Sequence, residues 1–288
     1  MKITYLGTAA AEGWPALFCN CESCKKALAA GGRNIRSRSQ ALINSDLLID
    51  FPADSMWHKA AGGFDFSAVT DLIVTHSHCD HFYPVDLQFR SDRSYSHELT
   101  SPTLNLYGNE AVLDRYYRAF GCPEKDIPKD AYYTIPYGVK PFLAEKFKPF
   151  STGKYLITPL PARHDAKETC LNYLISDGEK TILYLHDTGL PLDETYDYLT
   201  ANNVKADLVS YDCCYVVKQV ESRHIGHMGV PGNEFVRDKL IALGVATPST
   251  VHVINHFSHN GMLIYDELQP YAAEKGFVTT YDGMTIEI

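Results

Sequence analysis

The chain has 288 residues, 45% of them hydrophobic and 21% charged, which is typical of a globular protein with a large core. Its formal net charge of −9 argues against a broad nucleic-acid-binding surface, because such a surface is basic. No stretch approaches the roughly 20 apolar residues of a membrane span, and the first residues lack a signal peptide's basic and apolar segments. We therefore expect a cytoplasmic protein without a membrane partner.

Short apolar runs rich in Val, Ile, Leu and Tyr recur along the chain and predict strands. In chain order they are Lys2–Leu6, Gln40–Ile49, Asp71–Thr75, Leu104–Tyr107, Tyr155–Pro159, Cys170–Ser176, Thr181–His186, Leu208–Tyr211, Thr250–Ile254 and Gly276–Ile288. Helical patterns cover Glu110–Phe120, Leu192–Ala201, Pro231–Leu243 and Tyr265–Glu274. This order favours an α/β fold with sheets in the middle and helices outside. No linker divides the chain, so we expect one domain over residues 1–288.

Ligand-type residues gather at the end of one predicted strand. The run that begins at Asp71 ends in Thr75-His76-Ser77-His78-Cys79-Asp80-His81. His76 and His78 are two residues apart and share one face of an extended chain, whereas Asp80 and His81 follow where the chain should turn. Imidazole and carboxylate suit Zn, Mn and Fe. The alternative, a polar loop with chance histidines, is disfavoured because the chain has only 12 histidines. A polar segment, Phe82–Pro102, follows the motif and predicts a long loop or lid.

The pattern His-x-His-x-Asp-His at a strand end resembles the signature of the metallo-β-lactamase fold superfamily. Members of that superfamily supply a further histidine, a bridging aspartate and a late histidine at other strand ends, and the matching positions here are His164, Asp187 and His256. Upstream, Leu47–Asp50 is similar to the superfamily's early aspartate strand. The resemblance covers nearly the whole chain and implies a four-layer αββα sandwich.

The same resemblance implies two divalent metal ions, Zn or Mn with Fe as an alternative. One ion would be held by His76, His78 and His164 and the other by Asp80, His81 and His256, with Asp187 bridging them.

This ligand set indicates a reaction class. In two-metal sites the bridging water becomes hydroxide at neutral pH, and the cations hold negative charge as it develops. Imidazole and carboxylate ligands leave positive charge on the pair, which attracts an anionic substrate although the chain is acidic. The hypothesis is hydrolysis of a small cyclic or nucleotide-like phosphodiester, with Asp80 counted among the catalytic residues.

Three thiols form a second cluster, Cys19, Cys21 and Cys24. Thiolates suit tetrahedral zinc, and closed sites with four protein ligands are structural. His259, three residues after His256, can complete the set; the alternative is a group of buried free thiols. An early Cys-x-Cys-x-x-Cys with a late His-x-x-His resembles the PhnP-like phosphodiesterase subgroup, in which the extra zinc is structural. The segment 7–15 also resembles the start of pyrroloquinoline quinone biosynthesis protein B.

A leaving alkoxide needs a proton donor, and histidine suits that role near neutral pH. In the phosphodiesterase branch, a histidine in the region just before the predicted helix Pro231–Leu243 has this role. We expect it to be His227, with His224 as the alternative, while a solvated loop histidine is the ordinary interpretation. His186 adjoins Asp187, but neighbouring strand residues point to opposite faces. Arginines that could bind a phosphate bidentately, though each alone is an ordinary surface charge, are Arg90, Arg93, Arg163 and Arg223.

Three other functions stay open. A tRNA 3′-processing nuclease shares the motif but needs an RNA-binding arm and a basic surface, and the sequence shows neither. A lactonase would use the same metals on a carbonyl carbon and would not need His227. A cofactor-biosynthesis protein like the quinone relative, binding one iron, is the non-hydrolytic alternative. The sequence leaves open the substrate, the physiological metal and the oligomeric state, for which a homodimer is one expectation.

Overall fold

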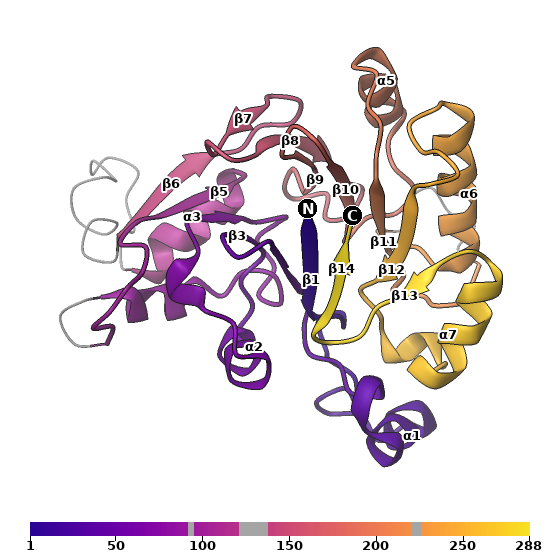
Figure 1. Cartoon of the computed structure of the whole chain (residues 1–288). Helices are drawn as coiled ribbons and strands as arrows, with labels where there is room; N and C mark the ends of the chain where they lie inside the picture. Colours follow the sequence, from indigo (N-terminus) through magenta and orange to yellow (C-terminus); the bar gives the residue numbers. More distant parts are fainter. Residues whose placement is uncertain (92–94, 121–137, 220–225) are drawn as a thin grey trace.

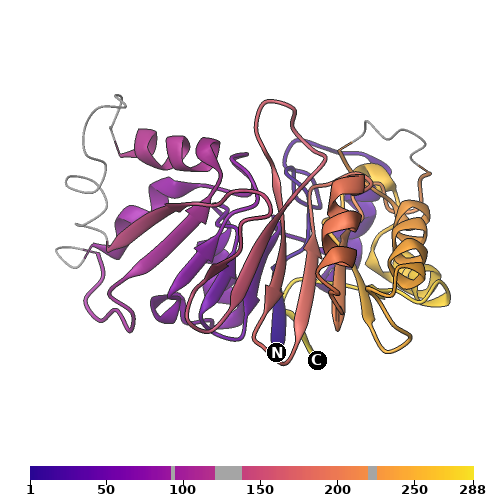
Figure 2. The ribbon, with the colours of Figure 1, turned by 90° about the horizontal axis from the view of Figure 1, so that it is seen from above.

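Two seven-stranded sheets pack face to face, with helices on their outer faces (Figures 1 and 2). The computed structural model describes residues 1–91, 95–120, 138–219 and 226–288. The first sheet has the order β14-β1-β2-β3-β4-β5-β6 and the second β13-β12-β11-β10-β9-β8-β7. Helices α2 and α3 contact the first sheet, whereas α6 and α7 contact the second. The expected αββα sandwich is therefore confirmed.

The elements have the following bounds. The strands of the first sheet are β1 (Lys2–Gly7), β2 (Gln40–Ile43), β3 (Leu47–Ile49), β4 (Asp71–Ile73), β5 (Leu104–Gly108), β6 (Val139–Leu143) and β14 (Met284–Glu287). Those of the second are β7 (Phe150–Ser151), β8 (Leu156–Pro161), β9 (Leu171–Ser176), β10 (Thr181–Leu185), β11 (Leu208–Asp212), β12 (Val251–Asn255) and β13 (Val278–Thr279). The described α-helices are α1 (Glu22–Ala30), α2 (Ser55–Gly62), α3 (Glu110–Ala119), α5 (Asp193–Ala201), α6 (Val230–Ala242) and α7 (Tyr265–Glu274).

Both faces of the strands are apolar because both are covered. In β3, Leu47 and Ile49 enter the cluster between the two sheets, whereas Leu48 enters the outer cluster together with Val112 of α3. Successive strand residues point to opposite faces, so a run of apolar residues fills both layers at once. This explains why these strands read as continuous apolar runs and not as alternating ones.

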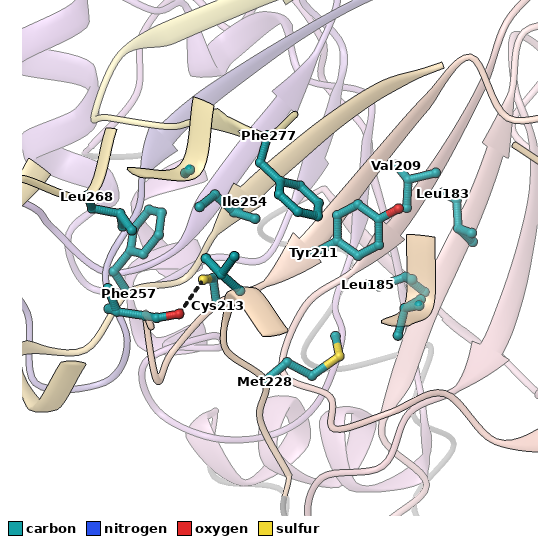
Figure 3. Packing of buried hydrophobic residues seen from close by; sticks show 14 of the residues in the cluster. Leu183, Leu185, Val209, Tyr211, Cys213, Met228, Ile254, Phe257, Leu268 and Phe277 are labelled. Atoms are coloured by element: carbon teal, nitrogen blue, oxygen red, sulfur yellow. Dashed lines mark hydrogen bonds between the residues drawn. The ribbon is translucent and has the colours of Figure 1, made fainter. Parts of the chain in front are cut away.

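A third apolar cluster covers the outer face of the second sheet. Figure 3 shows Tyr211 of β11 beside Phe277, which follows α7, with Val209 next to Tyr211 and Leu268 of α7 farther along the same cluster. Phe257 belongs to the same cluster and is fully buried. Because Phe257 directly follows His256 in the chain, this packing holds one end of the predicted metal site in place.

The structure corrects several of the predicted elements. The run Gln40–Ile49 forms two strands, because the chain reverses at Asn44, which has a left-handed φ of 49°. Gly276–Ile288 likewise divides into β13 and β14, which lie in different sheets. The segment Phe82–Pro102 contains a 3₁₀ helix over Pro84–Arg90, and its residues 92–94 lie outside the described part. The sequence patterns do not predict helices α1 and α2. No helix within the described ranges is long and apolar enough to cross a membrane.

The topology brings several strand ends to one edge of the sandwich. Strands β3 and β4 are parallel in the first sheet, and β10, β11 and β12 are parallel in the second. The carboxyl ends of parallel strands meet at the same edge, where ligand-type residues can converge. The residues that end or follow these strands include Asp50, Thr75, Asp187, Asp212 and His256.

Candidate metal centre

Three histidines from two loops form the first ligand group. The ligand atoms of His76, His78 and His164 all lie within 4.8 Å of one another. His78 Nδ1 is 3.3 Å from His164 Nε2. His76 Nε2 is buried, has no hydrogen-bond partner among the described residues and lies 3.3 Å from Asp187 Oδ2. Buried polar atoms are normally paired, so an unpaired imidazole nitrogen facing other ligand atoms fits a metal ligand.

A second group shares the same aspartate. Asp80, His81, Asp187 and His256 offer ligand atoms within 4.8 Å of one another. His81 Nε2 lies 2.9 Å from Asp187 Oδ2 and 3.3 Å from Asp80 Oδ2. His256 Nε2 lies 2.7 Å from Asp187 Oδ1. Asp187 thus contacts histidines of both groups, as a bridging carboxylate would.

The backbone is strained where these side chains are presented. Asp50, Asp187 and His256 have φ values of 64°, 48° and 64°. Each left-handed residue of this kind costs on the order of 1–3 kcal/mol and persists only where the surroundings enforce it. All three lie just beyond strand ends, so the candidate centre carries strain of this kind.

Burial and mutual charge set the protonation states of the cluster. Burial alone would raise the pKa of Asp187, but the neighbouring His256 and His81 lower it well below its ordinary value. Burial and the nearby His81 lower the pKa of His76 well below its ordinary value. The carboxylate of Asp187 and the neutral imidazole of His76 are the forms that bind metals. Asp187 raises the pKa of His81 and His256 well above the ordinary value, so a metal ion bound there would displace their protons.

Two further carboxylates, Asp50 and Asp212, contact the outer nitrogens of His81 and His256. The sequence motifs do not assign a role at the site to either aspartate. Asp50 Oδ2 lies 2.7 Å from His81 Nδ1, and Asp212 Oδ2 lies 3.4 Å from His256 Nδ1. The contact of Asp50 is a hydrogen bond, and such a partner fixes the tautomer and orientation of a ligating histidine. The contact of Asp212 with His256 is a longer ion pair. A signal for Asp212 exists in the sequence, because it directly follows the predicted strand Leu208–Tyr211 as ligands follow other strands.

His227 lies beside both groups. Its Nδ1 is 2.9 Å from Asp212 Oδ2 and 3.7 Å from Asp187 Oδ1. Its ring lies nearly parallel to that of His256, with centroids 5.6 Å apart. Burial lowers the pKa of His227, but the Asp212 carboxylate outweighs this effect and raises the pKa above its ordinary value. This shift favours the protonated form of His227 near the centre.

The remaining candidates divide between the described and undescribed residues. The alternative acid His224 lies outside the described residues, as do Arg93 and Arg223. Arg90 Nη2 donates to the carbonyl of Ser101, and Arg163 Nε donates to that of Leu190. His186 Nε2 lies 2.7 Å from Ser210 Oγ in the core, which agrees with the expectation that His186 points away from the metals.

The thiol cluster is a separate four-residue group. Ligand atoms of Cys19, Cys21, Cys24 and His259 lie within 4.8 Å of one another. Cys21 Sγ is 3.5 Å from His259 Nδ1, and this contact is the main reason that the pKa of Cys21 falls to about 6. A thiolate among two further thiols and an imidazole fits a closed tetrahedral zinc site. On the outer side, His259 Nε2 lies 3.7 Å from Glu12 Oε1.

A family model described as a beta-lactamase superfamily domain matches residues 53–248. The matched range contains the motif at residues 75–81 together with His164 and Asp187. It ends before His256 and begins after the thiol cluster, so the match does not reach those parts of the two sites. No curated protein matches the sequence.

Solved structures resemble the chain over its full length. A diphosphatase of the PhnP family has 18% identity and a TM-score of 0.72, covering 100% of this chain and 97% of its own. Zinc-bound PqqB from Methylobacterium extorquens has 19% identity and a TM-score of 0.73, covering 100% of both chains. The short form of human tRNase Z has 17% identity and a TM-score of 0.65, covering 100% of this chain and 99% of its own. At these identities the likeness establishes the fold alone.

Proposed function

Because the chain belongs to the beta-lactamase superfamily, whose members are mostly metal-dependent hydrolases, we propose that it is a dinuclear metal-dependent phosphodiesterase. Its substrate would be a small cyclic or nucleotide-like phosphodiester. The observation that carries this proposal is the position of one carboxylate. Asp187 contacts histidines of both ligand groups, and His227 Nδ1 lies 3.7 Å from its Oδ1.

The ligand groups would hold two divalent cations, Zn or Mn with Fe as an alternative. The bound pair would supply a water that is deprotonated at neutral pH and positive charge for the developing anion. The first group is His76, His78 and His164, and the second is Asp80, His81 and His256, with Asp187 shared. The residues fit this role because the buried Nε2 of His76, unpaired among the described residues, faces the other ligand atoms.

The protein's own contribution to the chemistry is a positioned acid. Cleavage of a phosphodiester leaves an alkoxide, which departs more easily when a proton is delivered to it. Asp212 accepts from His227 Nδ1, so the opposite ring nitrogen, Nε2, is the one free to give its proton to the leaving oxygen. By raising the pKa of His227, Asp212 also favours the charged form of the acid before the reaction.

The thiol cluster supports a narrower proposal, that the chain is similar to the PhnP-like phosphodiesterase subgroup. We assign Cys19, Cys21, Cys24 and His259 to a structural zinc, as in the PhnP-like phosphodiesterases that the sequence resembles. The four ligand atoms within 4.8 Å of one another support this assignment. The full-length likeness to the fold of a PhnP-family diphosphatase supports treating residues 1–288 as one domain.

An activity screen tests the proposal and separates it from its rivals. Metal-reconstituted protein would be assayed against cyclic phosphates, linear phosphodiesters and lactones, with metal content measured in parallel. We expect phosphodiester cleavage with two exchangeable metals and one tightly held zinc. Lactone cleavage without phosphodiester cleavage would replace the proposal with a lactonase. A single redox-active iron without hydrolysis would favour a cofactor-biosynthesis protein.

A further inference from the structure

The loop between β8 and β9, residues 162–170, does more than supply one ligand, His164, to the first group. His164 belongs to this loop, and two acidic residues that follow it, Asp165 and Glu168, contact the histidine motif that follows β4. We propose that Glu168, assisted by Asp165, is a positioning residue that assembles the first metal position of the proposed hydrolase. This inference rests on the proposed two-metal site but not on the identity of the substrate.

Glu168 holds the residue between two ligands. Ser77 separates His76 from His78, and its hydroxyl donates to Glu168 Oε1 at 2.7 Å. Its backbone N–H also faces the carboxylate, 3.1 Å from Oε2 and 3.2 Å from Oε1. Fixing both the side chain and the backbone of Ser77 fixes the direction in which the two flanking imidazoles leave the chain.

Glu168 is itself held by a buried residue. Asn109 Nδ2 donates to Glu168 Oε2 at 2.8 Å and to the carbonyl of Thr169 at 2.7 Å. The Asn109 side chain also caps α3, because its Oδ1 accepts from the N–H of Val112 at 2.9 Å. Asn109 is only 4% exposed, so the carboxylate is anchored to the rigid start of a helix. These hydrogen bonds form a clamp that fixes Ser77, and with it the histidine motif, relative to the start of α3.

Asp165 completes the arrangement on the other side of His78. Its Oδ2 lies 3.1 Å from His78 Nε2, while His78 Nδ1 faces His164. The carboxylate therefore assigns Nδ1 of His78 to the metal and Nε2 to the protein. Outer carboxylates of this kind raise the basicity of a ligating imidazole and fix its tautomer. One loop thus gives the first position its third ligand and orients the other two.

Within the described part of the chain, Asp165 and Glu168 form no hydrogen bond with the second ligand group. The imidazoles of His81 and His256 have Asp50 and Asp212 behind them, which follow β3 and end β11. Loss of the Glu168 clamp should therefore weaken one metal position and spare the other. A merely structural role would instead lower the stability of the fold and affect both positions together.

The test measures metal binding, with Mn²⁺ as the probe. Glu168→Gln keeps the size of the side chain but replaces one acceptor oxygen with a donor, and Ser77→Ala removes the hydroxyl that donates to Glu168. Lys167→Gln is the matched control, because Lys167 is exposed and adjacent. Each substitution is made in the full chain and in a His256→Ala background, which isolates the first position. Free Mn²⁺ is followed by electron paramagnetic resonance during titration.

We expect Glu168→Gln to weaken Mn²⁺ binding at the first position about 10- to 100-fold, the range typical of residues that hold metal ligands in place without touching the metal. A His164→Ala background, which leaves the second position, should show less than about a twofold change, and Lys167→Gln should match wild type in both backgrounds. Excess Mn²⁺ should restore hydrolysis of any substrate found. Unchanged binding at the first position, or equal weakening of both positions, would overturn the inference.

If Glu168→Gln folds poorly, Ser77→Ala alone tests the same contact; where both fold, their double variant supplies an independent check. If the two residues act through their mutual hydrogen bonds, the double variant should bind Mn²⁺ no more weakly than the worse single variant. Additive losses would show that they act separately and would contradict the clamp. Both measurements read metal affinity, so they stand even if the protein proves to hydrolyse lactones instead of phosphodiesters.

Discussion

Asp212 Oδ2 lies 2.9 Å from His227 Nδ1, and this single carboxylate also reaches His256 Nδ1 at 3.4 Å. Asp212 is fully buried. It therefore links the residue proposed to donate a proton with a residue proposed to bind metal. Any change at Asp212 should affect both, whereas a change at His227 should affect proton donation alone.

The first prediction concerns His227. His227→Asn should lower kcat for an alkyl phosphodiester about 10²- to 10⁴-fold, the usual contribution of general acid–base catalysis. The loss should be much smaller for bis(p-nitrophenyl) phosphate, because nitrophenolate leaves without needing a proton. Steady-state kinetics on the two substrates, with metal content verified, measures the contrast. An equal loss on both substrates would remove His227 from the role of acid.

The second prediction concerns the shared carboxylate. Asp187→Ala and His76→Ala should each abolish cleavage of bis(p-nitrophenyl) phosphate, because each removes a ligand from a buried cluster in which the other groups cannot replace it. Circular dichroism should show a folded protein, since the sheets do not depend on these side chains. Metal chelation of the wild type should reproduce the loss, and added Mn²⁺ or Zn²⁺ should reverse it. Wild-type rates at saturating metal in either variant would contradict the site.

The third prediction concerns the thiol cluster. Cys21→Ala should remove one zinc per chain and leave the two exchangeable metals in place, because the proposed zinc ligands are distinct from those of the dinuclear groups. Stability should fall, with a midpoint of thermal unfolding lower by about 5 °C or more, since each kcal/mol is worth about 2–4 °C in a chain of this size. Elemental analysis and thermal denaturation test both parts. Loss of the catalytic metals in parallel would show that the two sites are not independent.

Much of the candidate site follows from position relative to strands. His164, Asp187 and His256 are predictable because each comes just after an apolar run, and parallel strands place their carboxyl ends together. The role of Glu168 cannot be predicted in this way, since Glu168 lies within the loop that follows β8 and belongs to none of the motifs. Its role depends on a contact with Ser77, 91 residues away along the chain, so nothing in the local sequence marks it.

The helices and strands also differ in how far the local sequence predicts them. Helix α7 is predicted with its observed bounds, because its apolar spacing is regular. Helix α1 is not predicted, because its start depends on Cys21, whose thiol accepts from the N–H of Cys24 and caps the helix. In the sequence that cysteine indicates only a zinc ligand. The split of Gln40–Ile49 into two strands depends on one left-handed residue, Asn44, in an otherwise continuous pattern.

The last prediction concerns acid stability and a histidine outside both sites. His58 is buried, with Nδ1 2.6 Å from Gln40 Oε1 and Nε2 2.7 Å from Ser37 Oγ. Burial lowers the pKa of His58 to about 4, with Asp54 opposing the shift only in part. An unfolded histidine has a pKa of about 6.5, so between about pH 6.5 and 4 the unfolded state binds a proton that the folded state does not.

Stability should therefore fall as the pH drops through this window, by at most about 3 kcal/mol from His58 alone. His58→Gln should flatten the dependence of unfolding free energy on pH between about 4 and 6.5, even if it lowers stability at neutral pH. His97→Gln is the control, because His97 is exposed. Urea unfolding at several pH values, with metal content held constant, measures the difference between the variants. Identical slopes for His58→Gln and wild type would show that His58 does not contribute to the acid sensitivity.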